Sequence, residues 1–569
     1  MDKKAKVTII GSVAIVLIIV IALGVSISNK LAPSKEVMPL IDYYQVEDTE
    51  VFVILQDKIY EKKGMLIDGV VYLEYETIVS EFNHRFYWDY NENILTYTTP
   101  NEILQTEAES SDYTVTKSMI KTNAAEEYQI VKVFADKVYI ALKFVEQYSD
   151  MTFQFYKNPN RVVINYKWDD YLFTEVDKNT QLRLEASIKS PILIENLTKG
   201  TSLMYVDLEE APQKGFSKVM TEDGIIGYVR DKYVKKSFYK TISSTYQEPE
   251  YTTQTRSGKI NLVFHQVFNK DVVDNMEGLI NATEKVTVIS PTWFSINDVS
   301  GTISSLATEE YVEKAKDLGL EVWALVDDFN TEVSMFELLS HTSSRENLSN
   351  VLIEAALEYK LNGINIDFEK ISLEAGIHYI EFLRELSVKC RNNGIVLSVD
   401  NPVPAPYNAY YDREEQGKIL DYVIIMAYDE HYSGDEVAGP VASIGFVKDA
   451  VTNTLDMVPK EKTIIAIPFY NRLWKETEDG IVSSENFSMT PAADILKENS
   501  AEAKWDDTLG CYYAEYVKDG ATYRLWQEED KSIEEKMKVI YEADVAGIAA
   551  WKLGLEKESI WDIILRYLN

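Results

Sequence analysis

Short apolar runs alternate with amphipathic stretches over residues 259–569. Eight runs read as strands: 260–266, 285–290, 321–326, 363–369, 395–400, 422–428, 463–469 and 546–551. The stretches between them, such as 344–360 and 373–391, repeat apolar residues at helical spacing. Eight strand–helix alternations in about 300 residues predict an α/β fold, a (β/α)8 barrel of the TIM type. Residues 473–531 are too long for a simple connection, and they predict a small α+β insertion with strands near 511–517 and 522–526.

A longer apolar run lies near the N-terminus. Residues 7–29 carry no charge, and Lys3, Lys4 and Lys6 precede them. About 20 helical residues span a bilayer, and the preceding lysines favour a cytoplasmic N-terminus. We therefore expect residues 1–30 to form a cytoplasmic tip and a single transmembrane helix, with the rest of the chain extracytoplasmic. The alternative is a cleaved signal peptide and a secreted chain, although such peptides have shorter apolar regions of about 7–15 residues.

An internal repeat occupies residues 44–170. DGVVYLEYETIVSEF (68–82) is echoed by DKVYIALKFVEQY (136–148), and FYWDYNENILTYTT (86–99) by QFYKNPNRVVINYK (154–167). Each copy predicts a strand, a short amphipathic helix and a β-hairpin. The pattern resembles the small α+β stalk module at the N-terminus of copper amine oxidases and on many Gram-positive surface proteins. Since no histidine cluster accompanies it, copper binding does not carry over, and we expect a spacer.

Residues 183–240 predict a small all-β module. Short alternating strands are separated by Gly-containing turns, and the segment Gly215–Val229 reads GFSKVMTEDGIIGYV. This pattern resembles the bacterial SH3 domain, and the resemblance implies a small SH3-like β-barrel. The resemblance implies binding to cell-wall peptides, with a passive spacer as the alternative. The polar segments 31–43 and 241–258 are interpreted as a tether and a linker.

Charge and cysteine content exclude several classes of partner. The chain has 92 acidic and 57 basic residues, a net charge of −35, so its surface repels phosphate backbones and we expect no nucleic acid partner. Its two cysteines, Cys390 and Cys511, exclude a disulfide scaffold and a Cys-rich metal site. The five histidines fit no metal-ligand spacing. We therefore expect neither a metal nor another cofactor.

The run from Gly363 to Glu369 carries the most informative pattern. Its side chains alternate between two faces, which separates Ile364, Ile366 and Phe368 from Asn365, Asp367 and Glu369. Neighbouring carboxylates repel one another in a closed core. The polar face is therefore expected at the carboxyl-end mouth of the barrel, where the sites of such barrels lie. The alternative is an exposed edge strand whose acids lie in water.

Residues 362–369 resemble the signature D-G-x-D-x-D-x-E of glycoside hydrolase family 18. Further segments agree with the family: Met426-Ala427-Tyr428-Asp429 with its M-x-Y-D, Ile467-Pro468-Phe469-Tyr470 together with Arg472, and Trp551 at the end of the eighth strand. The resemblance covers about 259–569 and is closest to the bacterial branch that acts on peptidoglycan, including spore-cortex N-acetylglucosaminidases. It implies cleavage of β-1,4-linked N-acetylglucosamine polymers, with peptidoglycan preferred and chitin as the alternative.

The family resemblance also implies a role for each residue in a substrate-assisted, retaining hydrolysis. Glu369 is then the general acid and base, and the substrate's own 2-acetamido oxygen is the nucleophile. Asp367 orients the acetamido group, Tyr428 donates a hydrogen bond to it, and Trp551 forms the floor beneath the sugar. Further substrate contacts are implied for Asn365, Met426, Asp429, Tyr470 and Arg472.

Two departures from the family signature matter. Asn362 and Asn365 stand where family members have aspartates. Because an amide holds no charge, we expect Asp367 to ionise more readily and the Asp367–Glu369 pair alone to set the pH profile. The missing acids leave two alternatives to an enzyme: a lectin that keeps the groove, and a surface scaffold with a vestigial barrel. The presence of Glu369, Asp367 and Tyr428 together favours an enzyme.

Four more residues lie near predicted strand ends. Trp293 and Trp323 could contact a sugar or pack in the core. Asp327 and Asp328 could bind sugar hydroxyls or cap a turn. The sequence leaves both pairs of interpretations open.

Overall fold

A computed structural model describes residues 13–23, 25, 32–208, 215–269, 273–283, 285–480 and 482–568. The described residues form two compact units. The first is drawn from Met1–His84, Ala108–Ser111 and Glu126–Glu248, and the second from Arg85–Glu107, Asp112–Ala125 and Pro249–Asn569. The boundary between the units therefore crosses the predicted repeat.

The first unit contains an eight-stranded sheet to which both copies of the repeat contribute. In each copy a strand leads directly into a short helix, as predicted: β4 (Val70–Glu74) into α3 (Tyr75–Glu81), and β11 (Lys137–Ala141) into α4 (Leu142–Tyr148). The other strands are β1 (Glu50–Leu55), β2 (Lys58–Ile59), β3 (Gly64–Ile67), β10 (Val131–Phe134), β12 (Thr152–Tyr156) and β13 (Arg161–Asn165). The hairpin β12–β13 of the second copy joins this sheet, because β13 pairs in parallel with β1.

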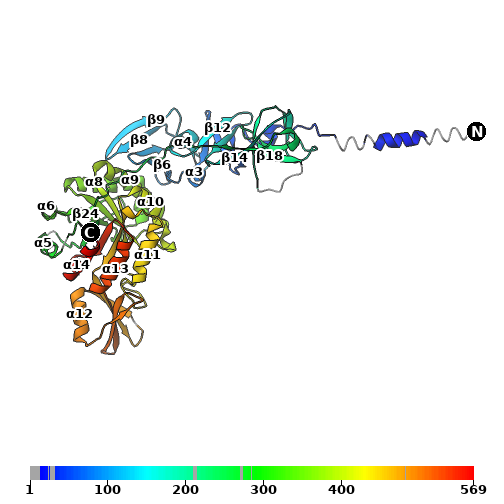
Figure 1. The fold of residues 1–569 in the computed structure, drawn as a ribbon. Coiled ribbons are helices and arrows are strands. Elements are labelled where there is room, and N and C mark those ends of the chain that lie inside the picture. Colours follow the sequence, from blue (N-terminus) through cyan, green and yellow to red (C-terminus); the bar gives the residue numbers. More distant parts are fainter. Residues whose placement is uncertain are drawn as a thin grey trace, which may run out of the picture. The chain divides into compact units, whose positions relative to one another are not determined.

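The hairpin of the first copy forms as predicted but belongs to the second unit. Its strands β5 and β6 continue into a separate five-stranded antiparallel sheet. The strands are β5 (Tyr87–Asp89), β6 (Ile94–Thr98), β7 (Ile103–Glu107), β8 (Asp112–Lys117) and β9 (Ile120–Ala125). In Figure 1 this sheet, labelled at β8 and β9, lies beside helices α8 (Thr342–Glu358) and α9 (Gly376–Asn393).

A seven-stranded antiparallel sheet forms the rest of the first unit; short strands were predicted for residues 183–240, and the sheet begins earlier, at Asp170. Its strands are β14 (Asp170–Glu175), β15 (Thr180–Arg183), β16 (Ile192–Leu197), β17 (Ser202–Tyr205), β18 (Phe216–Met220), β19 (Ile226–Arg230) and β20 (Phe238–Thr241). The segment interpreted as a tether packs on this sheet, in contrast to a free linker. The amide of Met38 donates to the carbonyl of Ile192 at 2.9 Å, and Tyr44, at the end of helix α2 (Leu40–Tyr44), is buried in its core.

The second unit is built on a closed barrel of eight parallel strands, as predicted. The strands are β21 (Ile260–His265), β22 (Val288–Ile296), β24 (Glu321–Asp327), β25 (Gly363–Asp367), β26 (Val396–Pro402), β27 (Tyr422–Met426), β28 (Thr463–Pro468) and β34 (Gly547–Trp551). Pairing of β21 with both β22 and β34 closes the ring, and β23 (Ile303–Ser305) adds an antiparallel partner to β22. Strand β25 lies between β24 and β26, which excludes the exposed-edge interpretation.

Helices surround the barrel, and the alternation predicted for β25 decides which side chains meet them. The helices are α5 (Val273–Asn281), α6 (Glu309–Asp317), α7 (Met335–Ser340), α8, α9, α10 (Arg413–Ile419), α11 (Ile444–Leu455), α13 (Asp530–Glu542) and α14 (Ser559–Tyr567). Ile364, Ile366 and Phe368 are fully buried in the layer between strands and helices. A smaller apolar cluster that includes Leu325 and Ile424 fills the barrel interior.

An inserted antiparallel sheet separates β28 from α13. It consists of β29 (Tyr470–Thr477), β30 (Val482–Ser488), β31 (Lys504–Asp506), β32 (Cys511–Lys518) and β33 (Ala521–Gln527), with helix α12 (Met489–Glu498). The two strands predicted in this region are present. Figure 1 shows this insertion, in orange, projecting from one end of the barrel. The second half of the predicted linker also packs on the barrel, since Arg256 forms an ion pair with Glu321 at 2.7 Å.

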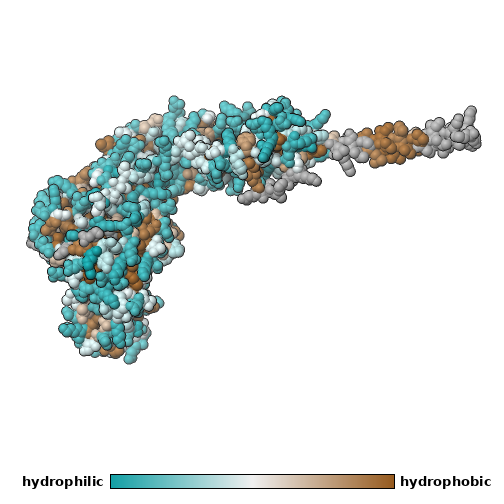
Figure 2. All heavy atoms as spheres, in the orientation of Figure 1, coloured by the Kyte–Doolittle hydropathy of each residue, from teal (hydrophilic) through white to brown (hydrophobic). Residues whose placement is uncertain are grey.

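Among the residues that the structure describes, no helix has the length and apolar character needed to cross a membrane. Residues 13–23 of the predicted anchor are helical, whereas residues 1–12, 24 and 26–30 lie outside the described part of the chain. The large aliphatic side chains of this helix, among them Ile15, Leu17 and Ile18, are exposed. They form the brown segment in Figure 2.

Candidate active site

The carboxyl ends of four barrel strands bring the predicted site residues to the same mouth. Asp367 ends β25, and Glu369 follows it by two residues. Tyr428 and Asp429 follow β27, and Trp551 ends β34. Tyr470 and Arg472 come from β29, which begins two residues after the end of β28. Because parallel strands all end at one face of a barrel, residues far apart in sequence converge there.

Asp367 is buried among other acids. Its side chain is 4% exposed, and its Oδ1 atom has no hydrogen-bond partner. Burial raises the pKa of this carboxyl well above its usual range, and the neighbouring carboxylates Asp400 and Glu369 raise it further. The expectation that Asp367 ionises readily with only Glu369 beside it is therefore wrong, because a third carboxyl faces it.

That third carboxyl, Asp400, was not singled out in the sequence. It lies on β26 and is 1% exposed. The amide Nδ2 of Asn365 donates to its Oδ2 at 2.5 Å, and Oγ of Ser398 donates to Oδ1 of Asn365 at 2.7 Å. The predicted substrate residue Asn365 is thus fully buried with its amide engaged inside the barrel. A signal for Asp400 exists in the sequence, because Ser398 and Asp400 alternate with the apolar residues Leu397 and Val399.

Glu369 reaches solvent at the mouth, and its backbone is held from both sides. The Asp328 carboxylate accepts hydrogen bonds from the amides of Glu369 at 3.0 Å and Lys370 at 2.8 Å. The Tyr411 hydroxyl donates to the carbonyl of Phe368 at 3.0 Å. Partial burial, then the negative charges of Asp328 and Asp429, raise the pKa of Glu369 to about 7. A carboxyl with that pKa carries a proton for much of the time at neutral pH.

The contacts of Asp327 and Asp328 distinguish turn capping from the binding of sugar hydroxyls. Asp328 caps the turn after β25, as described above. Asp327 accepts hydrogen bonds from Oγ of Ser295 at 2.8 Å and from the amide of Phe329 at 3.0 Å. Both aspartates therefore organise the backbone and side chains around the mouth.

The two tryptophans near strand ends belong to the core. Trp293 is 2% exposed and packs edge to face on Tyr311, with ring centroids 4.8 Å apart. Trp323 is fully buried and stacks on Tyr422. Of the two interpretations, core packing is confirmed for both.

Asp429 is held at the rim of the mouth by two buried side chains. Arg472 donates to its Oδ1 at 2.7 Å, and the Tyr470 hydroxyl donates to the same oxygen. Asp429 is exposed, whereas Arg472 and Tyr470 are each 3% exposed. The structure therefore brings these three predicted residues together, with Asp429 as the one that faces solvent.

Half-buried aromatic side chains border the carboxylates. Trp551 packs on Phe264 with ring centroids 5.4 Å apart, and Tyr428 packs edge to face on Tyr470 at 6.4 Å. Burial and the nearby Asp400 and Asp367 raise the pKa of Tyr428 well above its usual value. Tyr428 therefore keeps its proton and remains a hydrogen-bond donor. Met426, at the end of β27, is also half-buried.

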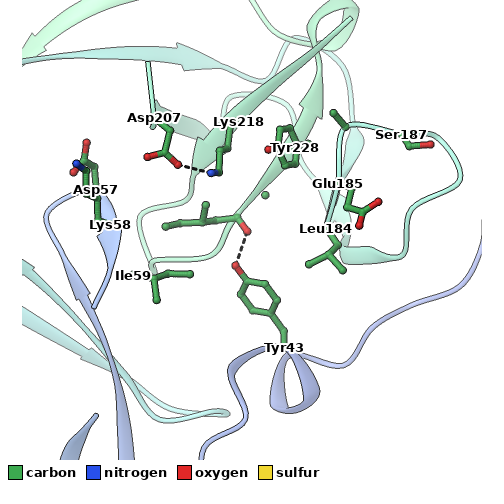
Figure 3. Close-up of a pocket in the computed structure, with 13 residues that line it drawn as sticks. Tyr43, Asp57, Lys58, Ile59, Leu184, Glu185, Ser187, Asp207, Lys218 and Tyr228 are labelled. Carbon is green, nitrogen blue, oxygen red and sulfur yellow. Dashed lines mark hydrogen bonds and ion pairs between the residues drawn. The ribbon is translucent and has the colours of Figure 1, made fainter. Parts of the chain in front are cut away.

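A separate cavity lies in the first unit. It measures about 770 Å³ and is bordered by the β1–β2 turn and the seven-stranded sheet. Figure 3 shows acidic and basic groups around it, with Lys218 paired to Asp207 and the Tyr43 hydroxyl donating to the carbonyl of Ile226. Glu185 and Tyr228 also line the cavity. Its mixed charge suits a ligand that carries both carboxylate and ammonium groups.

Comparison with known proteins identifies relatives of the barrel unit. The family described as "Glycosyl hydrolases family 18" matches residues 250–556. The uncharacterized glycosylase YvbX of Bacillus subtilis is 26% identical over 278 residues, which cover 47% of this chain and 80% of the relative. The cortical fragment-lytic enzyme of Bacillus subtilis is 28% identical over 247 residues, 41% of this chain and 56% of the relative.

Solved structures agree on the fold. The spore cortex-lytic enzyme SleL of Bacillus cereus matches with a TM-score of 0.50 and 21% identity, and the match covers 55% of this chain and 74% of that structure. At this level of identity the likeness concerns the barrel fold alone. The chain spans about half of the length of the cortical fragment-lytic enzyme. The matches to YvbX and to the cortical fragment-lytic enzyme each cover less than half of this chain.

Proposed function

The chain belongs to family 18 of the glycosyl hydrolases and is a glycoside hydrolase, and from that premise we propose that it cleaves β-1,4-linked N-acetylglucosamine polymers of the bacterial wall. The observation that carries the proposal is the exposed Glu369 at the mouth, whose pKa is raised to about 7, beside the buried Asp367. An acid that is protonated near neutral pH can give its proton to a glycosidic oxygen.

In this proposal Glu369 acts first as the acid and then as the base. It protonates the leaving oxygen while the substrate's own 2-acetamido oxygen attacks the anomeric carbon. The product is an oxazolinium ion, and Glu369, now ionised, removes a proton from the water that opens it. The backbone amides of Glu369 and Lys370 donate to the Asp328 carboxylate, and these hydrogen bonds hold the backbone of Glu369 in place for both steps.

Asp367, Tyr428 and Trp551 complete the site for the acetamido group. The Asp367 carboxyl accepts the acetamido N–H and stabilises the positive charge that develops on the ring. The Tyr428 hydroxyl, which keeps its proton, donates to the acetamido oxygen. The Trp551 indole, half-buried against Phe264, offers an apolar surface for the sugar ring. Asp429, fixed by Arg472 and Tyr470, accepts hydrogen bonds from sugar hydroxyls at the rim.

Peptidoglycan is the substrate that the observations favour over chitin. One relative is named a cortical fragment-lytic enzyme, and the solved SleL structure is titled a spore cortex-lytic enzyme. The mixed-charge cavity of the first unit supports the same choice, because wall peptides carry both carboxylates and amines. We therefore propose that this SH3-like module binds wall peptides through that cavity.

Location outside the cytoplasm is also part of the proposal. Residues 7–29 carry no charge, and the exposed aliphatic side chains of residues 13–23 suit a lipid environment. We propose a single-pass anchor with the catalytic unit on the outer side. Membrane fractionation and N-terminal sequencing test this: recovery of a shortened, secreted chain contradicts the anchor.

The decisive experiment compares the wild-type full chain in detergent with Glu369→Gln on peptidoglycan and on a chitin oligosaccharide. Glu369→Gln is expected to lower kcat by about 10³-fold without loss of substrate binding, because only the proton transfer is removed. Glu374→Gln, the same change at an exposed neighbouring position, is the matched control and keeps full activity. Binding without turnover by the wild-type chain indicates a lectin and contradicts the proposal.

Mass spectrometry of the products then distinguishes the substrates. Fragments that end in reducing N-acetylglucosamine are expected from peptidoglycan. For the cavity, Tyr228→Ala is expected to weaken binding of the full chain to purified walls, whereas turnover of a soluble oligosaccharide stays unchanged. Equal wall binding by the variant and the wild type assigns the module to a spacer role.

A further inference from the structure

Asp400 has no role in the mechanism described so far, although it is buried beside the acid that handles the acetamido group. The register of β25 and β26 pairs Asn365 with Ser398 and Ile366 with Val399. The next position places Asp367 directly opposite Asp400. Both side chains point into the barrel, as the contact of Asn365 with Ser398 and Asp400 requires. Neighbouring strands are about 4.8 Å apart, so the two carboxyls are adjacent.

The carboxyls of Asp367 and Asp400 each have a buried oxygen that takes part in no hydrogen bond. The Oδ1 atoms of Asp367 and Asp400 are buried, and neither has a hydrogen-bond partner. Asp327, which lies opposite Asp367 on the other side, differs because both of its oxygens accept hydrogen bonds. Two adjacent buried carboxylates repel each other and lack solvation, and a proton shared between them removes both costs.

The residue at position 365, on β25, explains why the acid beside Asp367 is Asp400 from β26. Family 18 signatures have an aspartate there, and this chain has an asparagine whose Nδ2 donates to Oδ2 of Asp400 at 2.5 Å. The amide therefore holds one oxygen of Asp400 and leaves the other for Asp367. We propose that Asp400 is a positioning residue of the hydrolase and the proton partner of Asp367, in place of the acid that position 365 lacks. This inference rests on the proposed function.

The proposed step moves one proton and keeps the charge of the pair at −1. Before reaction, Asp367 carries the proton and Asp400 is ionised. As the acetamido oxygen bonds to the anomeric carbon and the glycosidic bond breaks, the acetamido N–H becomes more acidic. The proton on Asp367 then passes to Asp400, and the resulting Asp367 carboxylate stabilises the oxazolinium ion. When water opens this ion, the proton returns to Asp367.

The groups around Asp400 support this assignment. The titratable side chains whose charges act together with it are Asp367 and Glu369 at the end of β25, Tyr428 after β27 and Tyr379 on α9. None of these is a cation, and burial raises the pKa of both Asp400 and Asp367 well above the usual range. These surroundings favour a proton shared by the pair over two separate charges.

The test exchanges the positions of acid and amide in the full chain. Asp400→Asn is expected to lower kcat by about 10²-fold with little change in KM, because the transferred proton loses its acceptor. The exchange variant Asn365→Asp/Asp400→Asn is expected to regain roughly tenfold of that loss, since it restores one acid beside Asp367. Asp421→Asn is the matched control: this buried aspartate accepts backbone hydrogen bonds at the amino end of β27, and its loss lowers Tm without changing the pH profile.

Infrared spectroscopy supplies a readout that does not need turnover. With 13C-labelled aspartate, the wild-type chain is expected to show a protonated carboxyl band at neutral pH, and in Asp400→Asn this band should disappear at a lower pH than in the wild type because Asp367 loses its neighbouring carboxylate. Unchanged kcat and pH profile in Asp400→Asn, no recovery in the exchange variant at equal Tm, or absence of the band each overturn the proposal. A wild-type chain that shows the band but hydrolyses neither glycan refutes the proposed function and leaves the proton-sharing pair established.

Discussion

Two groups of buried carboxyls in the barrel unit differ in what faces them. At the mouth, Asp367, Asp400 and Asp328 face other carboxyls. Around the helices α9, α10 and α13, an equally buried group faces cations: Glu381, Glu385, Glu415 and Glu528. All of these groups are removed from water. The second group has close positive partners that compensate for the lost solvation, whereas at the mouth the charge of Lys370 acts on Asp328 from a position outside the group.

The cation-paired group is built with close ion pairs. Each pair joins a buried Arg or Lys to its carboxylate: Arg345–Glu385 at 3.0 Å, Arg384–Glu381 at 3.1 Å, Arg384–Glu415 at 2.9 Å and Lys536–Glu528 at 2.9 Å. Ser532 also donates to Glu528 at 2.9 Å. Two of these pairs connect neighbouring helices, Arg345–Glu385 joining α8 to α9 and Arg384–Glu415 joining α9 to α10.

The contrast separates structural from chemical uses of a buried acid. A cation beside a buried carboxylate lowers the pKa that burial raises, as Arg384 does for Glu381 and Lys536 does for Glu528, although burial still holds the pKa of Glu381 at about 7. A carboxyl beside other carboxyls keeps a proton near neutral pH, which costs stability but makes proton transfer available. Burial raises the pKa in both groups, so the partner of each buried acid is what distinguishes the two groups.

Removal of the cation from one pair tests this contrast most strongly. Lys536→Met leaves Glu528 buried and unpaired, and we expect a loss of about 3–5 kcal/mol at pH 8. Burial already raises the pKa of Glu528, and loss of Lys536 raises it further, so stability is retained below the unfolded pKa and lost as the pH rises through the folded pKa. The loss at pH 5 should accordingly be smaller than at pH 8.

Thermal unfolding of the variant at the two pH values measures the effect. Lys538→Met, on the same helix but in an exposed pair with Glu535, is the control and should change stability by less than about 1 kcal/mol. Equal losses at pH 5 and pH 8 would mean that the Glu528 charge is compensated by another group.

The acid group at the mouth predicts the pH dependence of turnover. The pKa of Glu369 is raised to about 7, and its protonated form is the acid. We therefore expect kcat/KM to fall above pH 7 by about tenfold per pH unit, with an apparent pKa that belongs to the coupled carboxyls together. Among the charged neighbours, Asp328 raises the pKa of Glu369 most. Asp328→Asn should therefore move the fall in kcat/KM to lower pH. If kcat/KM of Asp328→Asn falls at the same pH as in the wild type, the assignment of this pH dependence to Glu369 is wrong.

The barrel and most of its mouth could be predicted because their signals are local. Each parallel strand is buried on both faces, so it appears as an apolar run, and polar residues at 365, 367 and 369 stand out against it. The sequence did not reveal that Asp400 faces Asp367. Their proximity depends on the register between β25 and β26, which are about 33 residues apart in the chain. No local pattern reveals that register.

The two copies of the repeat show the same limit. Each sequence predicts a hairpin, and each hairpin forms. The pattern did not predict that one hairpin pairs with β1 whereas the other extends into a sheet of the barrel unit. One difference between the copies concerns a side chain in the hairpin: the first copy has Asp89 where the second has Lys157. Asp89 is fully buried, and Lys157 is exposed.

Asp89 provides the N-terminal cap of α8, a role that the helix's own N-cap residue His341 does not fill. Its Oδ2 accepts hydrogen bonds from the amide of Thr342 at 2.6 Å and from the Thr342 hydroxyl at 2.7 Å. Asp89→Ala is therefore expected to cost about 1–2 kcal/mol, the usual value of a lost cap. Hydrogen exchange of the α8 amides should accelerate by roughly 5–30-fold. Lys157→Ala is the matched control from the other copy, and it should leave exchange in α8 unchanged. Unchanged exchange in Asp89→Ala would mean that the sheet of strands β5 to β9 contacts α8 without stabilising this helix.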